Sequence, residues 1–301
     1  RIATGGKAGS YYPIGQLLAQ GLTGRSGPEC PEGCGLQGVL AVAQLSNGSV
    51  ANVEAVQQGS VEAGLAQADV VSWAYNAEHV FADAPAHDRL RVIGTLFIET
   101  LHIVVAADSE IRNVGDLAGA RVSLGPPGSG TLVDTRLVLA AHGLDEDDLQ
   151  ARYLKPHAAR EAFRAGTLDG FFLIAGHPTP SVSDLAAEVP LRLLPVEPEV
   201  ARSIGYDVPF LRPVRIPADA YNGVEATPTV GVGAQLVVNA EMSAARAYNI
   251  TEQLWSERMA RIFQHGHPRG AEIDIGDALA GAGIPLHPGA AGWYQRRGML
   301  P

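Results

Sequence analysis

The chain has 301 residues, of which 46% are hydrophobic and 18% are charged. This composition is typical of a folded globular protein and excludes an intrinsically disordered chain. The formal net charge of −10 argues against a nucleic-acid partner, because phosphate binding needs a basic surface. No apolar run is long enough to cross a bilayer.

Short apolar runs alternate with amphipathic runs through the first two thirds of the chain. Strands are predicted over residues 1–4, 39–45, 63–67, 91–97, 101–107, 121–124, 152–154, 170–174 and 191–194. Helices are predicted over residues 10–21, 49–58, 69–79, 132–142, 158–165 and 198–204, with further helices starting at Asp145 and near Pro180. Ser10, Ser49 and Asp69 are predicted as N-caps. The alternation favours a parallel or mixed α/β sheet.

The last third of the chain has a different character. A long apolar strand is predicted over residues 229–238 and a long helix over 244–264. The tail from Gly266 onward is rich in glycine, proline and histidine. The sequence shows no internal repeat of fixed period. The length is sufficient for one large domain or for two lobes of ordinary size.

Three loops share a design that suits an anion. The loops at residues 5–11, 46–52 and 125–131 each follow a predicted strand, combine glycine with serine or threonine, and lead into a helix. The free amide hydrogens at a helix start and the helix dipole attract negative charge, and glycine lets a ligand approach the backbone. Each loop alone can also be an ordinary helix cap. Three together favour a shared anion site at the carboxyl edge of the sheet.

Nucleotide, metal and catalytic motifs are absent from these loops. Residues 125–131 lack the lysine of a phosphate-binding P-loop, and residues 5–9 do not fit the dinucleotide fingerprint. Ser129 lacks the flanking glycine pattern of a hydrolase elbow, and no histidine or carboxylate motif is placed to activate it. None of the nine histidines stands in a metal-binding pattern. We therefore expect neither an enzyme, nor a metal site, nor a cofactor.

The two cysteines, Cys30 and Cys34, lie in a short segment that contains proline and glycine. Their spacing is not the C-x-x-C of a redox pair, and no further metal ligand is close in sequence. We predict a tight loop closed by a Cys30–Cys34 disulfide, which implies an oxidising compartment. The alternative is two unpaired surface thiols in a cytosolic protein. The chain opens directly on a predicted strand, as expected for a periplasmic protein whose signal peptide has been removed.

The three loops are also where the sequence resembles a known family. The opening Thr4-Gly5-Gly6, followed by Gly9-Ser10-Tyr11-Tyr12-Pro13, is similar to the start of the TAXI family, the TRAP-associated extracytoplasmic binding proteins. Further matching segments follow in order at residues 46–52, 57–59, 67–75, 122–131, 166–172, 176–178 and 285–291. The departure is Gly5-Gly6-Lys7-Ala8, where the family more often has a Gly-Ser type of turn.

This resemblance implies a type II periplasmic-binding-protein fold, in which two α/β lobes joined by hinge strands close on a ligand in the cleft between them. The first lobe is expected at residues 1–104 plus 235–301 and the second at 105–234, with hinges in 101–107 and 230–238. The implied function is a monomeric receptor that delivers a dicarboxylate or an amino acid, such as glutamate or 2-oxoglutarate, to a sodium-coupled TRAP permease. The alternatives are a periplasmic sensor module and an α/β hydrolase or transferase.

Eleven residues are the candidate ligand contacts. They are Gly9, Tyr11, Ser49, Asn52, Gln67, Asp69, Ser129, Gly130, Thr131, Phe172 and His177. The backbone amides and hydroxyls around Gly130 form the expected carboxylate cradle, with helix capping as the alternative. Tyr11 either covers the ligand or fastens the first helix. Asp69 repels a ligand carboxylate but suits a ligand ammonium.

The other candidates carry similar alternatives. Ser49 and Asn52 belong to the second loop, where Ser49 can be cap and ligand donor at once. Phe172 lines either the ligand site or the core. His177 either meets a carboxylate or is a plain turn residue. No arginine stands inside the three loops, so Arg136 and Arg160 are the candidates for pairing with a ligand carboxylate.

Overall fold

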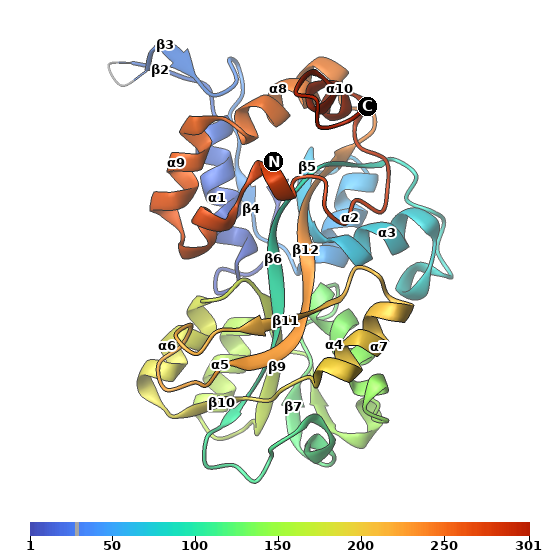
Figure 1. The fold of residues 1–301 in the computed structure, drawn as a ribbon, viewed down its shortest axis with the longest axis vertical. Coiled ribbons are helices and arrows are strands. Elements are labelled where there is room, and N and C mark those ends of the chain that lie inside the picture. The colour runs from blue at the N-terminus through green and yellow to red at the C-terminus, as the bar shows by residue number, and fades with distance from the viewer. Residues whose placement is uncertain (28–29) are drawn as a thin grey trace. The chain divides into compact units, whose positions relative to one another are not determined.

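The computed structural model describes residues 1–27 and 30–301, with the side chains of 1–26 and 34–301 (Figure 1). Backbone contacts divide the described chain into two compact units. Unit 1 consists of Arg1–Gly5, Tyr11–Phe97 and Gly233–Pro301, and unit 2 consists of Gly6–Ser10 and Ile98–Val232. The chain passes between the units on either side of the Gly6–Ser10 loop and inside two long strands, β6 (Leu90–Ala106) and β12 (Thr227–Asn239).

Unit 1 holds a sheet with parallel and antiparallel pairs. Its strands are β1 (Ile2–Ala3), β4 (Ala43–Gln44), β5 (Ala63–Gln67) and the adjoining parts of β6 and β12. Strand β1 pairs in parallel with β4 and β5, while β12 pairs antiparallel with β5, so that Val237 lies opposite Gly64. A separate hairpin is formed by β2 (Arg25–Gly27) and β3 (Cys30–Cys34).

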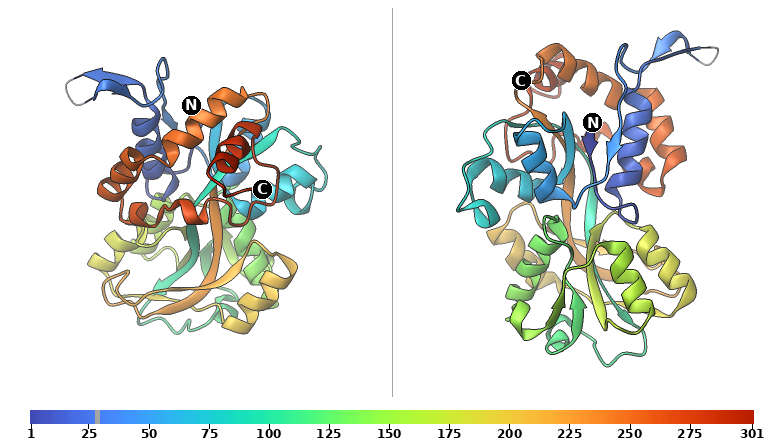
Figure 2. Two further views of the ribbon diagram at one scale, coloured as in Figure 1. Left: turned by 45° about the horizontal axis from the view of Figure 1, so that its top comes forward. Right: turned by 180° about the vertical axis from the view of Figure 1, so that it is seen from behind.

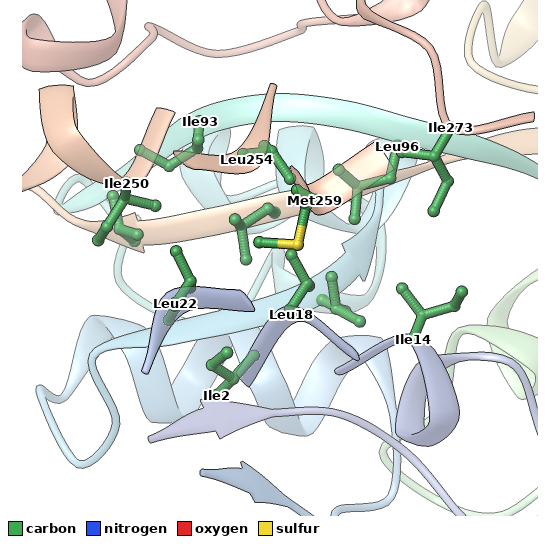
Figure 3. Close-up of a cluster of buried hydrophobic side chains, with 14 of the residues drawn as sticks. Ile2, Ile14, Leu18, Leu22, Ile93, Leu96, Ile250, Leu254, Met259 and Ile273 are labelled. Carbon is green, nitrogen blue, oxygen red and sulfur yellow. The ribbon is translucent and has the colours of Figure 1, made fainter. Parts of the chain in front are cut away.

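The helices of unit 1 bury apolar faces against this sheet. They are α1 (Tyr11–Leu22), α2 (Ser49–Gln57), α3 (Ala68–Asn76), α8 (Ala244–Leu254), α9 (Glu257–Gly266) and α10 (Pro288–Arg296). Ile14, Leu18 and Leu22 recur every fourth residue along α1 and share a core cluster with Leu254 and Met259 (Figure 3). Short 3-10 helices complete the unit at His79–Phe81, Pro268–Glu272 and Ile275–Asp277.

Unit 2 also contains parallel and antiparallel strand pairs. Its strands are β7 (Arg121–Ser123), β8 (Gln150–Arg152), β9 (Gly170–Ala175), β10 (Leu191–Leu193), β11 (Arg212–Ile216) and the remaining parts of β6 and β12. Strand β7 pairs in parallel with β8 and β9, and β9 pairs antiparallel with β6. The sheet order and the mixture of directions confirm the predicted α/β class.

Helices lie on both sides of the unit 2 strands (Figure 2). They are α4 (Gly130–Ala141), α5 (Pro156–Arg164), α6 (Pro180–Glu188) and α7 (Pro198–Asp207), with 3-10 helices at Val114–Leu117 and Glu146–Asp148. The core of the unit includes Phe171 of β9, whose ring meets that of Phe163 of α5 edge-on with centroids 5.7 Å apart.

Several predicted elements are corrected by the structure. The two strands predicted over 91–97 and 101–107 are one strand, β6, because the polar pair Glu99 and Thr100 between them is itself buried in the strand. The long helix predicted over 244–264 is divided, because the Ser256 hydroxyl accepts a hydrogen bond from the Met259 amide and starts α9. Strand β11 and helix α10 were not predicted.

Two further features concern the compartment. Within residues 1–27 and 30–301, no helix is long and apolar enough to cross a membrane. The side chain of Cys30 lies outside the described residues, so its disulfide with Cys34 stays a prediction.

Candidate functional site

The predicted cradle in unit 2 lies where two parallel strands end. Strands β7 and β9 pair in parallel, so their carboxyl ends meet at one edge of the sheet. The loop after β7 leads into α4, and the loop after β9 leads through His177 into α6. These are the places at which open α/β sheets bind ligands, and both loops carry residues singled out in the sequence.

Glycine is required in the loop before α4. Gly125 has a φ of 97°, and a Cβ at this position would lie 2.8 Å from the Thr131 methyl carbon. Gly128 also has a positive φ, of 81°. A side chain at Gly125 is therefore strained and has no room. The backbone fold of this loop depends on the glycines that the sequence analysis associated with ligand approach.

Ser129 caps α4, as the alternative interpretation stated. Its hydroxyl accepts a hydrogen bond from the Leu132 amide at 3.1 Å and donates to the Pro126 carbonyl at 2.6 Å. The Thr131 hydroxyl accepts a hydrogen bond from the Ile174 amide of β9 at 3.1 Å. Both hydroxyls therefore fix the loop and α4 in place. The amides of Gly130 and Thr131, the first two of the helix, have no acceptor within the helix, so they can donate to an anion.

The loop Gly6–Ser10 is hydrogen-bonded to the same edge of unit 2. The Ser10 hydroxyl accepts a hydrogen bond from the Gly176 amide at 2.9 Å. The Ala8 carbonyl accepts a hydrogen bond from the Ser181 hydroxyl at 2.7 Å, and the Gly9 amide closes the loop onto the Gly6 carbonyl at 3.1 Å. The first and third glycine-rich loops, which are more than a hundred residues apart in sequence, therefore belong to one unit.

His177 and Phe172 are both placed by β9. The His177 Nδ1 lies 3.1 Å from the Thr100 hydroxyl, which in turn donates to the Ala175 carbonyl at 3.2 Å. Phe172 is 3% exposed and points to the face of β9 opposite Phe171, whose side belongs to the unit core.

A hydrogen-bonded chain behind this edge was not predicted. The Tyr221 hydroxyl accepts from the Thr179 amide at 3.1 Å and lies 2.7 Å from Nε2 of His102, while His102 Nδ1 lies 2.9 Å from the Thr100 carbonyl. His102 therefore donates from Nδ1 to the Thr100 carbonyl, and its Nε2 shares a hydrogen bond with the Tyr221 hydroxyl. The position of His102 inside an otherwise apolar strand was the one sequence feature that could have indicated this hydrogen-bonded chain. No sequence signal marks Tyr221.

In unit 1 the second glycine-rich loop stands at the carboxyl ends of β4 and β5. The predicted N-cap at Ser49 is wrong, because Gly48 occupies that position with a φ of 123°. The Ser49 hydroxyl instead donates to the Gln67 side-chain oxygen at 3.1 Å and accepts from the Gln67 amide at 3.2 Å. Two candidate residues thus hold each other at the starts of α2 and α3.

Asn52 is fully buried and joins two strands of unit 1. Its side-chain nitrogen donates to the Thr4 carbonyl of the β1 end at 2.6 Å and to the Leu65 carbonyl of β5 at 2.7 Å. Both hydrogens of the amide are therefore used between strands. Only its side-chain oxygen is left as a possible ligand contact.

Tyr11 and Asp69 are buried at helix starts in unit 1. Tyr11 opens α1 and belongs to the core cluster, which agrees with the expectation that it fastens this helix. The predicted N-cap at Asp69 is wrong, because Gln67 is the residue before α3 and Asp69 lies inside the first turn. Its carboxylate there is favoured by the helix dipole.

The two candidate arginines are used in ion pairs of unit 2. Arg136 pairs with Glu146, and Arg160 pairs with Asp184 at 2.6 Å and with Glu161 at 3.1 Å. Neither side chain contacts the loop before α4 in a hydrogen bond of the described residues. The same described residues contain no group of three or more histidine, cysteine, aspartate or glutamate side chains that could hold a metal ion. The cradle can therefore attract an anion through backbone dipoles.

Comparison with known proteins defines the class of this fold. The architecture of two α/β units is that of type II periplasmic binding proteins. The chain belongs to the NMT1-like family, a family of periplasmic solute-binding proteins, which it matches over residues 2–298.

The chain is similar to solved structures at low sequence identity, and two of them with TM-scores above 0.5 support the fold. A protein of Bordetella bronchiseptica RB50 is 16% identical and has a TM-score of 0.56, covering 100% of this chain and 88% of its own. A periplasmic transporter is 13% identical with a TM-score of 0.54, covering 88% and 87% of the two chains. The periplasmic aliphatic sulphonate binding protein SsuA of Escherichia coli is 20% identical with a TM-score of 0.46, covering 100% and 78%.

Proposed function

We propose that this protein is a periplasmic solute receptor of the TAXI type. It binds a small organic anion, such as a dicarboxylate, glutamate or 2-oxoglutarate, and delivers it unchanged to a sodium-coupled TRAP permease. Membership of a solute-binding family and the TAXI-like segments of the sequence support the class. The free backbone amides at the start of α4 support an anionic ligand.

The observation that carries the proposal is the arrangement of donors at Gly130 and Thr131. Their amides stand at the positive end of α4, and the hydroxyls of Ser129 and Thr131 are already bonded to Pro126, Leu132 and Ile174. Such a frame offers fixed N–H dipoles to an anion, with little reorganisation on binding. Binding through backbone dipoles needs no lysine or arginine in the loop.

The candidate contacts in unit 1 bear on the ligand class. We propose Tyr11, Ser49, Gln67 and Asp69 as further contacts, with Gly9, Phe172 and His177 in unit 2. A carboxylate such as Asp69 attracts a ligand ammonium and repels a second ligand carboxylate. A ligand contact at Asp69 therefore favours an amino acid over a dicarboxylate of the same length.

A ligand panel tests this function. The panel holds glutamate, 2-oxoglutarate, other dicarboxylates, a neutral amide of glutamate and an alkanesulfonate, because a helix start does not distinguish the kind of anion. At a ligand concentration of about one hundred times Kd, the free energy of unfolding rises by about 2.7 kcal/mol. This raises the Tm by about 4 °C for a protein of this size. Chromatography of the mixture afterwards should return the ligand unaltered.

The outcomes separate the alternatives. If glutamate stabilises the protein more than 2-oxoglutarate does, the result supports a contact between Asp69 and the ligand ammonium. If 2-oxoglutarate stabilises it more, the result rejects this contact. Conversion of the ligand identifies an enzyme. Absence of stabilisation by every member at saturating concentration rejects the organic-anion class.

A further inference from the structure

Unit 2 carries a groove that the proposed ligand site does not use. It lies between α4 and α7, which are neighbours in the structure (Figure 1). Its volume is about 520 Å³. Leu137 and Ala141 of α4 and Val200 and Val208 on the α7 side give it an apolar floor. An apolar floor of this kind can receive the aliphatic side chains of a partner segment.

The rim of this groove is acidic. Glu199 and Asp207 line it, and the side chain of Glu199 is 75% exposed. The neighbouring cation, Arg202, lies 3.8 Å from Glu199, but both side chains are largely exposed and such a pair is weak. The chain that leaves the end of α4 adds exposed carboxylates at Asp145 and Asp147. The groove therefore lies in a field that attracts positive charge.

The helix ends strengthen this field. Neither α4 nor α7 has a basic residue in its last turn. The carboxyl end of a helix carries partial negative charge, which a nearby cation stabilises. In α4, the His142 ring forms a hydrogen bond with the Val138 carbonyl at 2.7 Å, so one carbonyl of the last turn has a partner. The end of α7 at Asp207 combines the helix dipole with a carboxylate.

Tyr206 supplies an aromatic anchor beside the groove. It is 89% exposed, the largest value among the exposed large hydrophobic residues of the described chain. Glu199, Ser203 and Tyr206 recur at helical spacing, so Tyr206 stands on the same stripe of α7 as two residues that line the groove. Tyrosine is enriched among the residues that dominate binding energy at protein interfaces.

We propose that the α4–α7 groove docks a basic segment of the membrane permease, with aliphatic side chains on the floor and lysine or arginine against the acidic rim. The identity of the partner rests on the proposed function, whereas its chemistry rests on the groove. A second copy of the chain fits poorly, since a twofold interface would set the acidic rims against each other. An anionic lipid surface is repelled by the same charges.

Direct binding to the permease tests the proposal. The TRAP permease of the proposed function is purified into nanodiscs. Its affinity for the binding protein is measured by biolayer interferometry, with and without the ligand found in the panel. We expect Glu199→Lys with Asp207→Lys to weaken binding by tenfold or more, and Tyr206→Ala to weaken it comparably. Higher salt should weaken the wild type as well.

Controls keep the result specific to the groove. Glu110→Lys with Asp219→Lys makes the same change of net charge at exposed positions of unit 2 that do not line the groove. This control should bind the permease like the wild type. Calorimetry with the ligand should give the same Kd within twofold for all variants, which separates loss of docking from loss of the proposed ligand site.

Three results would overturn the inference. The first is that the groove variants and the control bind the permease with the same affinity, whether this affinity equals that of the wild type or is lower. The second is a wild-type protein that does not bind the permease at all while still binding its ligand. The third is a dimer, seen by light scattering, that Tyr206→Ala dissociates, because this result assigns the groove to a second copy.

Discussion

At the scale of single residues, two histidines of unit 1 act as helix N-caps. His287 Nδ1 accepts a hydrogen bond from the Gly289 amide at 3.1 Å, and His287 Nε2 donates to the Met242 carbonyl at 2.9 Å. His267 accepts similarly from the Arg269 amide at 3.1 Å. Burial lowers the pKa of both rings below the ordinary value of 6.5, because a charged ring would lose its acceptor nitrogen and its water.

These caps predict a loss of stability in mild acid. The unfolded chain takes up protons near pH 6.5, whereas the folded chain resists them. Stability is therefore complete above pH 6.5 and falls as the pH decreases from there toward the lowered pKa values. In His287→Asn the asparagine keeps a cap acceptor that does not titrate. We expect this variant to be less stable than the wild type by about 1 kcal/mol at pH 8, through loss of the bond to Met242.

The pH dependence is the diagnostic part of this prediction. Chemical denaturation at pH 8, 7, 6 and 5 should show a smaller loss of stability for His287→Asn than for the wild type. His265→Gln changes an exposed histidine and should follow the wild-type curve. Parallel curves for all three proteins would show that His287 does not titrate on unfolding.

Residue types alone did not separate caps from ligand contacts. Ser129 lies before α4 as predicted, whereas Thr131 lies in the first turn of the helix, and both hydroxyls hold the backbone frame. Capping and anion binding both use serine, threonine and glycine at helix starts, so composition favours the two roles equally. The roles of Asn52 and Tyr221 depend on contacts between strands and loops that are distant in sequence.

At the scale of elements, helix α10 shows how a glycine sets packing. A Cβ on Gly289 would overlap the Ala244 carbonyl oxygen and lie 2.7 Å from the Tyr248 amide nitrogen, both in α8. Gly292, one turn later in α10, has open space at its Cβ position. The close approach of α8 and α10 therefore requires glycine at the first position only.

The two glycines give a matched pair of variants. We expect Gly289→Ala to lower the free energy of unfolding by about 3 kcal/mol, because the helices must separate. Gly292→Ala should be neutral or raise it by about 0.5–1 kcal/mol, since alanine loses less backbone entropy in a helix. Urea unfolding checks both values. Equal effects of the two substitutions would contradict the close packing of α8 on α10.

Sequence patterns predicted several short strands and helices best, and among them β5 and β9 are buried along their whole length. Strands β5, β7 and β9 and helices α1, α2 and α5 lie close to their predicted ranges. Strand β11 was missed because it alternates arginine and proline with valine and is recognisable only by its pairing with β12. Helix α10 was missed because the glycine- and proline-rich tail hides a histidine cap followed by Pro288.

At the scale of the whole molecule, the order of elements carried more information than their lengths. Strands alternating with helices predicted the α/β class, which the structure and the NMT1-like family confirm. The predicted crossing points in the two long apolar strands lie near residues 104 and 234, and backbone contacts place them at 97 and 232. The inclusion of Gly6–Ser10 in unit 2 could not be predicted, because it depends on hydrogen bonds to residues 176 and 181.

The central claim is that the first amides of α4 bind the anion, and one substitution tests it most directly. Gly130→Pro removes the first amide hydrogen, and proline already opens α5, α6, α7 and α10 in this chain. Ser129, with φ −99° and ψ 150°, has the extended backbone that a following proline requires. The matched control is Ala244→Pro, which removes the equivalent amide hydrogen from α8.

Calorimetry of both variants with the ligand found in the panel is the decisive measurement. The account predicts that Gly130→Pro loses about 1.5–3 kcal/mol of binding free energy, the worth of a hydrogen bond to a charged group, while Ala244→Pro binds like the wild type. This loss raises Kd by about 10- to 100-fold, with both variants folded by circular dichroism. A folded Gly130→Pro protein with the wild-type Kd would contradict the claim.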